Sequence, residues 1–373
     1  MTPSPLRWTA ALALSIGALT SFSGCAGDPV ITAEQRIEAL RIEAAAWRAM
    51  GYRWDWKVAP TVAPGEEPRS TTASDDFVVF QESGGSLTGF SAGLGERLWV
   101  NQLGNSLAKF TGTAIVGSQV YVTSESELFI LDSTTGEMLD RQPFGQLVNT
   151  APLISGNLVI VGTNLGELLG HFVPAGLKAW GHRMPGVFEQ APVRVGQVVG
   201  AVTTSGRVIF VDPVSRRQTG LNDIFDGPGA PLGSGDNKLF VASLDQSLYA
   251  FDPRDASRIW QHRTPDPVRG APVFFGGVVY CSFREAGLTA LDANTGDVLW
   301  SNPELRGDAV AIRNGRLMIF GDGRISQIDP QRGTILESLP LPNTRYISTD
   351  GFEDGDLYLT SDDGVIARLV PVG

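Results

Sequence analysis

Histidines are the side chains most often used for metal binding and proton transfer, and this 373-residue sequence contains three of them. His182 and His262 each follow a tryptophan by two residues, in the same Trp-x-His-Arg pattern; the third is His171. Zinc needs ligands that converge on one point and usually lie at short spacings. Because His182 and His262 occupy equivalent places in a repeat, we expect structural or surface roles for them, and we expect no metal site.

The densest group of carboxylates is the stretch 350–356, Asp-Gly-Phe-Glu-Asp-Gly-Asp, followed by Asp362 and Asp363. It lacks the spacing and the distal glutamate of an EF-hand calcium loop. We interpret these carboxylates as solvated turn acids; the alternative is a docking patch for a basic partner. A nucleophilic serine is not indicated, because no Gly-x-Ser-x-Gly elbow occurs in a strand-to-helix context. The sequence therefore predicts no catalytic residue.

The N-terminus predicts export. Arg7 is followed by an apolar run from Trp8 to Leu19 and then by small residues up to Cys25. This order is typical of a secretory signal peptide, and the apolar run is too short to span a membrane. We predict a signal peptide over residues 1–24.

The two cysteines predict different chemistry. The sequence Phe22-Ser23-Gly24-Cys25 resembles a bacterial lipobox, whose cysteine is lipidated, for example with palmitate, and becomes the mature N-terminus. The alternative is an ordinary signal peptide with a chance cysteine. Ala26 stands where an inner-membrane retention signal usually has aspartate, so the resemblance implies the outer membrane, facing the periplasm. Cys281 lies in an apolar run and is expected to be buried.

Acidic residues outnumber basic ones, and the net charge is −11. Such a surface repels the phosphates of nucleic acids, so we expect no DNA or RNA partner. The high count of 44 glycines fits a fold with many turns.

The segment from Thr32 to Met50 has the pattern of a helix. Thr32 and Gln35 match a capping box. Apolar side chains recur at helical spacing, and Gly51 is placed to end the helix. We expect residues 25–51 to comprise the lipidated cysteine, a short linker and this helix. The helix either packs on the rim of the following domain, which we favour, or binds a partner.

A repeat of about 40 residues occupies the remainder of the chain. Its clearest copy runs from Ala290 to Trp300 and gives the template Ala-x-Asp-x-x-Thr-Gly-x-x-x-Trp. The position of the template aspartate recurs at Ser91, Asp132, Phe172, Asp212, Asp252, Asp292, Asp329 and Leu369. Each copy divides into four short stretches with β propensity that are punctuated by Gly, Asn and Asp. Four antiparallel strands in each of eight repeats predict an all-β fold, a single eight-bladed β-propeller.

Two features of the repeat predict how the blades fit together. The template tryptophans are expected to pack between blades, and they are Trp56, Trp99, Trp180, Trp260 and Trp300. Asp140, Gly220 and Glu337 replace them in three copies. The last copy lacks its fourth strand, and residues 52–58 resemble that strand. We therefore predict a propeller over 52–373 that the strand 52–58 closes.

An arginine recurs at one place in three neighbouring blades, at Arg269, Arg306 and Arg345. We expect the first strand of each blade to line the central channel, so these arginines would lie near it. They could bind an anionic ligand. We favour the alternative that they cap the channel and meet neighbouring carboxylates.

The template resembles the quinoprotein-type (PQQ-like) β-propeller repeat, whose tryptophan-docking motif is similar to residues 290–300. One branch of that family is the pyrroloquinoline quinone-dependent dehydrogenases; another is the non-enzymatic BamB-like lipoproteins of outer-membrane protein assembly. The lipobox and the single propeller resemble the second branch. The dehydrogenases typically hold their quinone with adjacent cysteines, which this sequence lacks. The resemblance thus implies no cofactor.

We therefore expect a non-catalytic, periplasm-facing lipoprotein that acts as a scaffold for protein partners, in particular the outer-membrane barrel-assembly machinery. Its contact with the membrane would be the lipid anchor on Cys25. The alternatives are a quinone-dependent or ligand-sensing propeller, and a module that binds a cell-envelope polymer.

Overall fold

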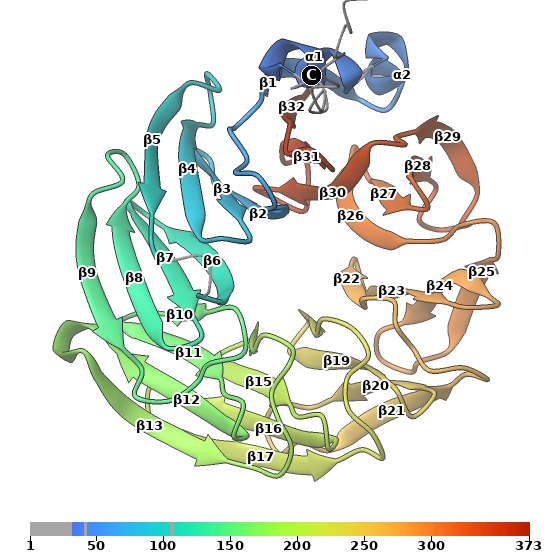
Figure 1. The fold of residues 1–373 in the computed structure, drawn as a ribbon. Coiled ribbons are helices and arrows are strands. Elements are labelled where there is room, and N and C mark those ends of the chain that lie inside the picture. Colours follow the sequence, from blue (N-terminus) through green and yellow to red (C-terminus); the bar gives the residue numbers. More distant parts are fainter. Residues whose placement is uncertain (1–31, 41–42, 105–107) are drawn as a thin grey trace, which may run out of the picture. The chain divides into compact units, whose positions relative to one another are not determined.

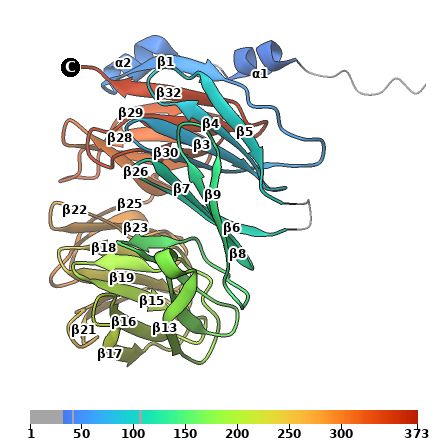
Figure 2. The same cartoon turned by 90° about the vertical axis from the view of Figure 1, so that its left-hand side faces the viewer.

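A computed structural model of the protein describes residues 32–40, 43–104 and 108–373 (Figures 1 and 2). The predicted signal peptide and Cys25 lie outside the described residues. In the described part of residues 33–373, eight four-stranded antiparallel sheets follow one another around a ring (Figure 1). The prediction of an eight-bladed β-propeller is confirmed. No helix among the described residues is long and apolar enough to cross a membrane.

Seven blades are each built from four consecutive strands. Blades I and II contain β2 (Pro68–Ala73), β3 (Phe77–Glu82), β4 (Ser86–Ser91), β5 (Arg97–Gln102), β6 (Phe110–Val116), β7 (Gln119–Ser124), β8 (Glu127–Asp132) and β9 (Met138–Pro143). Blades III and IV contain β10 (Leu153–Ser155), β11 (Leu158–Gly162), β12 (Glu167–Phe172), β13 (Leu177–Arg183), β14 (Val193–Val195), β15 (Val198–Val202), β16 (Arg207–Asp212) and β17 (Arg217–Asp223). A short 3₁₀ helix, η1 (Val173–Ala175), lies between β12 and β13.

Blades V and VI contain β18 (Gly233–Gly235), β19 (Lys238–Ser243), β20 (Ser247–Phe251), β21 (Arg258–Arg263), β22 (Val273–Phe275), β23 (Val278–Phe283), β24 (Gly287–Asp292) and β25 (Val298–Asn302). Blade VII contains β26 (Asp308–Arg313), β27 (Arg316–Gly321), β28 (Arg324–Ile328) and β29 (Ile335–Pro340). Blade VIII combines β30 (Thr344–Thr349), β31 (Leu357–Ser361) and β32 (Ile366–Pro371) with β1 (Tyr52–Val58).

The position of a strand within its blade explains the pattern of apolar and polar residues along it. The middle strands are covered on both faces, so they read as apolar runs; β16, for example, buries four successive residues. The outermost strands are exposed over most of their length. In β5 and β21 only the template tryptophan is buried, because its large ring packs against the next blade. The hydrophobic core consequently lies between neighbouring blades.

Four of the five template tryptophans join consecutive blades through a hydrogen bond as well as through apolar contact; Trp180 is buried between blades III and IV, but its Nε1–H has no hydrogen-bond partner among the described residues. The Nε1–H of Trp99 in blade I donates to the carbonyl of Ser133 in blade II at 2.8 Å. Trp56, Trp260 and Trp300 make the same bond to the next blade around the ring, to the carbonyls of Ala92, Ala293 and Pro330. Each of these four rings also covers a glycine in the left-handed conformation, for example Gly296 under Trp260.

At two of the three junctions where the tryptophan is replaced, another side chain makes the equivalent hydrogen bond. After Asp140, the side chain of Gln142 donates to the carbonyl of Val173 at 2.8 Å. Beside Gly220, the hydroxyl of Thr219 donates to the carbonyl of Pro253 at 3.0 Å. Both acceptors directly follow the template aspartate position in the next blade. The donor at the blade junction is therefore retained although the residue type is not.

The ring closes in blade VIII. Strand β1 pairs antiparallel with β32, in a register that runs from Tyr52 opposite Pro371 to Val58 opposite Ile366. This pairing gives the last blade its fourth strand from the opposite end of the described chain. Closure removes two open sheet edges, which would otherwise be sites for aggregation.

The predicted helix over 32–50 is corrected to two short helices, α1 (Ala33–Ala39) and α2 (Ala44–Ala49). Glu43 has extended backbone angles and caps α2, so the helix cannot run through it. The carbonyl of Leu40, which a continuous helix would use for its own hydrogen bond, instead accepts a bond from Nζ of Lys57. Tertiary contacts thus override the helical pattern.

Both helices pack on the propeller. Arg36 of α1 donates to the carbonyls of Pro60 and Asp363, at 3.0 and 2.8 Å. Trp47 of α2 is fully buried and belongs to the core cluster that blades VII and VIII share. This junction is where Glu337 replaces a template tryptophan. Trp47 therefore adds a buried indole to the junction where β29 has none, although its Nε1–H has no hydrogen-bond partner among the described residues.

A buried arginine fastens the same junction. Arg313 of blade VII is 7% exposed; it donates to the carbonyls of Gly51 and Val372 and pairs with Asp354 at 2.9 Å. Gln327 donates to the carbonyl of Met50 at 2.9 Å. We call the β1–β32 pairing of blade VIII and its junction with blade VII the seam. Arg313 and Gln327 together hold both ends of the described chain at this seam.

The acidic stretch 350–356 lies at this seam, and its interpretation as solvated turn acids is wrong for several members. Asp356 pairs with Arg368, which also pairs with Asp55 of β1 at 3.1 Å. Asp354 accepts the backbone N–H of Asn314 at 2.9 Å besides pairing with Arg313. The carboxylates therefore fasten strands and loops of the seam, which a sequence pattern does not reveal. Among the described residues, no group of three His, Cys, Asp or Glu side chains could hold a metal ion.

Replacing Gly296 by alanine should destabilise the junction between blades V and VI. A Cβ atom there would lie 2.7 Å from the ring of Trp260, and φ is +77°. We expect the free energy of unfolding, measured with urea, to fall by about 2–5 kcal/mol, from backbone strain and overpacking together. Gly276→Ala is the matched control, because φ is +57° there but no atom lies within 4 Å. Equal losses in the two variants would contradict the docking role of Trp260.

Asp354→Asn should weaken the seam in a pH-dependent manner. The N–H of Asn314, with Arg313 beside it, lowers the pKa of Asp354. The carboxylate therefore stabilises the fold above the pKa of the unfolded chain, about 4, and this contribution disappears as the pH falls through the lower folded pKa. We expect the variant to have a lower urea midpoint than the unchanged protein at pH 7. The difference between the two midpoints should become smaller toward about pH 3. Glu353→Gln changes an exposed residue of the same loop, and its urea midpoint should equal that of the unchanged protein at both pH values.

Candidate functional site

One face of the propeller carries both the loops that link successive blades and the turns between second and third strands. Antiparallel order places these segments at the same end of each blade, and backbone bridges tie them together, as between Val148 and Thr163 or Pro228 and Ser243. We call this surface the loop face. The opposite surface, the turn face, carries the turns that follow the first and third strands.

Apolar side chains are exposed on the loop face of blades III to V. Phe225 is 95% exposed, Leu165 54% and Leu147 46%. We call these three residues the apolar arc. The loops that carry them are held in place: the N–H of Asn164 donates to the carbonyl of Leu147, and the N–H of Phe225 donates to Asp245. An exposed phenylalanine on a loop that is held in place can bury a large apolar area against a partner, so this surface is a candidate protein-binding site.

A groove opens on the loop face of blades V to VII. Its main part has a volume of about 510 Å³ and is lined by residues that include Asp266, Arg269, Arg284, Arg306 and Asp322. A smaller part of about 160 Å³ continues from it past His262 and Arg263, and the two parts share Asp266, Pro267, Phe283 and Arg284. We call the whole the arginine groove.

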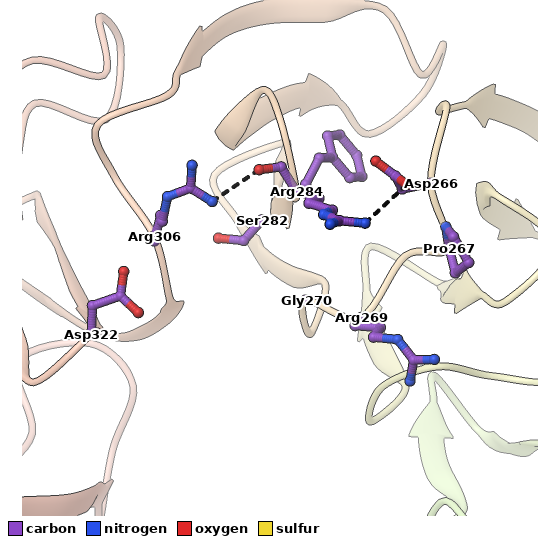
Figure 3. Close-up of a pocket in the computed structure, with 9 residues that line it drawn as sticks. Asp266, Pro267, Arg269, Gly270, Ser282, Arg284, Arg306 and Asp322 are labelled. Carbon is purple, nitrogen blue, oxygen red and sulfur yellow. Dashed lines mark hydrogen bonds and ion pairs between the residues drawn. The ribbon is translucent and has the colours of Figure 1, made fainter.

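Figure 3 shows how the arginines lie in the main part of the groove. The guanidinium of Arg306 reaches toward the backbone of Arg284 and donates to its carbonyl at 2.9 Å. Arg284 turns the other way, to Asp266, at 3.4 Å. Arg269 extends from the edge of the groove, and Asp322 lies below Arg306. Guanidinium groups held in this way can bind a carboxylate or a phosphate through charge and hydrogen bonds.

The three arginines that the sequence analysis singled out differ in their contacts. Arg345 pairs with Glu67 at 2.7 Å, as the preferred interpretation expected. Arg269 and Arg306 form no ion pair with any described residue, so for them that interpretation is wrong and the anion-binding alternative stays open. Arg284 was missed because it lies on the turn between a second and a third strand, which contributes to the groove only after folding.

The histidines have structural contacts. His171 is buried and hydrogen-bonds Gln142 at 2.7 Å; burial lowers its pKa. His182 contacts the carbonyl of Arg216 in the next blade, and His262 stacks on Phe283 beside the arginine groove. Cys281 is fully buried, as expected, and burial raises its pKa.

Comparison with known proteins assigns this propeller to a family. The family model described as outer membrane protein assembly factor BamB matches residues 46–145, 83–220 and 206–366, which together span all eight blades. The chain belongs to the BamB family. BamB of Burkholderia pseudomallei is 24% identical over 81% of this chain and 84% of its own length. BamB of Shewanella oneidensis is 24% identical over 74% of this chain and 78% of its own.

Solved structures show the same fold. BamB from Moraxella catarrhalis superposes with a TM-score of 0.66 at 19% identity, over 85% of this chain and 98% of that one. The computationally designed Ika8 protein superposes with a TM-score of 0.69 at 15% identity, over 82% of this chain and 96% of that one. The other branch of the repeat family is also represented. Quinoprotein ethanol dehydrogenase of Pseudomonas aeruginosa is 28% identical, over 25% of this chain and 16% of the enzyme.

Proposed function

We propose that this protein is a non-catalytic lipoprotein, anchored in the outer membrane and facing the periplasm, that binds protein partners during the assembly of outer-membrane β-barrel proteins. The observation that carries the proposal is the BamB family match over 46–366. A rigid ring of blades can present loops to several partners at once, since loops carry the specificity while the blades hold them. The match to a quinoprotein dehydrogenase is too short to favour catalysis.

The chain is divided into three functional parts. Residues 1–24 are a lipoprotein signal peptide, residues 25–51 begin with the lipidated Cys25 and include the helices, and residues 52–373 are the propeller. The partners are components of the barrel-assembly machinery, and the apolar arc is the surface through which we expect one of them to bind. Exposed aromatic anchors contribute most at protein interfaces because they bury a large apolar area.

Cys25→Ser should release the protein from membranes. Each buried CH₂ of an acyl chain contributes about 0.8 kcal/mol, so the loss of all acyl chains removes the anchor. We expect the variant in the soluble fraction of the native host, without incorporation of labelled palmitate. Cys281→Ser is the control and should stay with the membranes, because that side chain is buried in the propeller. A membrane-bound, unlabelled Cys25→Ser protein would contradict the lipid anchor.

A photo-crosslinking amino acid at position 225 should capture a component of the barrel-assembly machinery in intact cells. The control position is 214, because Val214 is similarly exposed, at 87%, but lies on the turn face. Mass spectrometry would identify the adducts. We expect assembly-machinery adducts from position 225 and a much smaller yield from 214. Recovery of no such component from either position would contradict the proposed partners, and equal yields would contradict the assignment of the apolar arc.

A further inference from the structure

The arginine groove contains cations that pair with no carboxylate among the described residues, namely Arg269 and Arg306 in its main part and Arg263 in its smaller part. Ion pairs engage many arginines of this acidic chain, among them Arg141, Arg313 and Arg368. Arg269 and Arg306 are exposed and pair with no carboxylate among the described residues, although the net charge of the chain is −11. Both line the same groove. A local excess of unpaired cations on an acidic protein attracts an anionic ligand.

The loops that carry these arginines are fixed before any ligand binds. The hydroxyl of Ser282 donates to the carbonyl of Gly307, which joins blade VI to the loop of Arg306. The carboxylate of Asp308 accepts the N–H of Ala271 at 3.0 Å, which joins blade VII to the loop of Arg269. A Cβ atom on Gly270 would lie 2.5 Å from the carbonyl of Ser282, so the loop of Arg269 packs against β23 too closely for a side chain at this position. The backbone of these loops therefore has little ordering entropy to lose on binding.

The lining of the groove favours a carboxylate over a phosphate. Arg284 pairs with Asp266 and so has part of its charge engaged, which leaves Arg306 and Arg269 to bind single carboxylates, each through a charge-assisted hydrogen bond. Pro267 and Phe283 add apolar walls, and the smaller part of the groove continues past the stacked rings of His262 and Phe283. The groove is therefore elongated and partly apolar, with a cation at Arg306, which suits an extended peptide.

We propose that the arginine groove binds an acidic segment of a partner protein, with an aspartate or glutamate carboxylate on Arg306 and Arg269 at the rim. The peptide would lie along the loop face of blades V to VII, beside Phe283. This inference rests on the proposed scaffold role, since the occupant is a protein, and it adds the chemistry of the recognised segment. It does not depend on which partner contacts the apolar arc.

The test measures binding of a defined probe to the purified full-length protein in detergent. The probe is the fluorescein-labelled peptide Gly-Glu-Ala-Glu-Gly, and its binding is followed by fluorescence anisotropy. We expect saturable binding that weakens with added salt, and a loss of affinity of about tenfold in Arg306→Gln, since one charge-assisted contact is removed. Arg254→Gln is the matched control: Arg254 is 86% exposed on the turn face, and its variant should bind as the unchanged protein does.

Three outcomes would overturn the proposal: equal binding of the peptide with glutamine in place of glutamate, equal loss of affinity in Arg254→Gln, or no peptide binding. Vesicles of phosphatidylglycerol and inorganic phosphate are tested alongside. Binding of either without binding of the peptide would assign the groove to a lipid headgroup or to free phosphate instead. Because the assay contains no assembly machinery, failure to bind the peptide is distinct from a failure of the crosslinking at position 225.

Discussion

At six of the eight blade junctions, a side chain of one blade donates a hydrogen bond to a carbonyl of the next blade. The bond starts from a side chain near the outer edge of one sheet and ends on a turn carbonyl of its neighbour, as from Trp99 to Ser133. The indole also buries a large apolar surface against a turn that needs a left-handed residue. Because the bond acceptor is backbone, the donor can change. Gln142 and Thr219 replace tryptophan while the geometry of the junction is kept.

Because the blades are held firmly against one another, the groups that could bind a partner lie on the loops. Blades that cannot shift relative to one another hold neighbouring loops in fixed contact, so groups from separate repeats meet on one surface. Arg284 comes from blade VI and Arg306 from the loop before blade VII, yet one donates to the backbone of the other. The same constraint holds Phe225 in an exposed position. Residues at these places contribute little to the core, so they are free to serve binding.

The fold could be predicted from the sequence because each blade needs the same turn between its third and fourth strands. The residues of that turn therefore recur at a spacing of about 40, which the sequence shows directly. The sequence predicted poorly wherever partners come from distant parts of the chain. The helical pattern over 32–50 did not indicate that Leu40 gives its carbonyl to Lys57. The carboxylates at 350–356 looked like surface acids because Arg313 and Arg368 meet them only after the ring closes. The exposure of Phe225 has no local signal at all.

The seam shows how the ends of the propeller are coupled. Blade VII has Glu337 where a tryptophan is expected, and blade VIII offers no aspartate turn after β32 for it to bind. Trp47, Arg313 and Gln327 fill that junction, and two of them bond to the backbone between α2 and β1. Pulling α2 away would expose the buried indole of Trp47, and displacing the backbone that follows α2 would remove the carbonyls that Arg313 and Gln327 bond. Helix α2 is therefore a structural part of the ring.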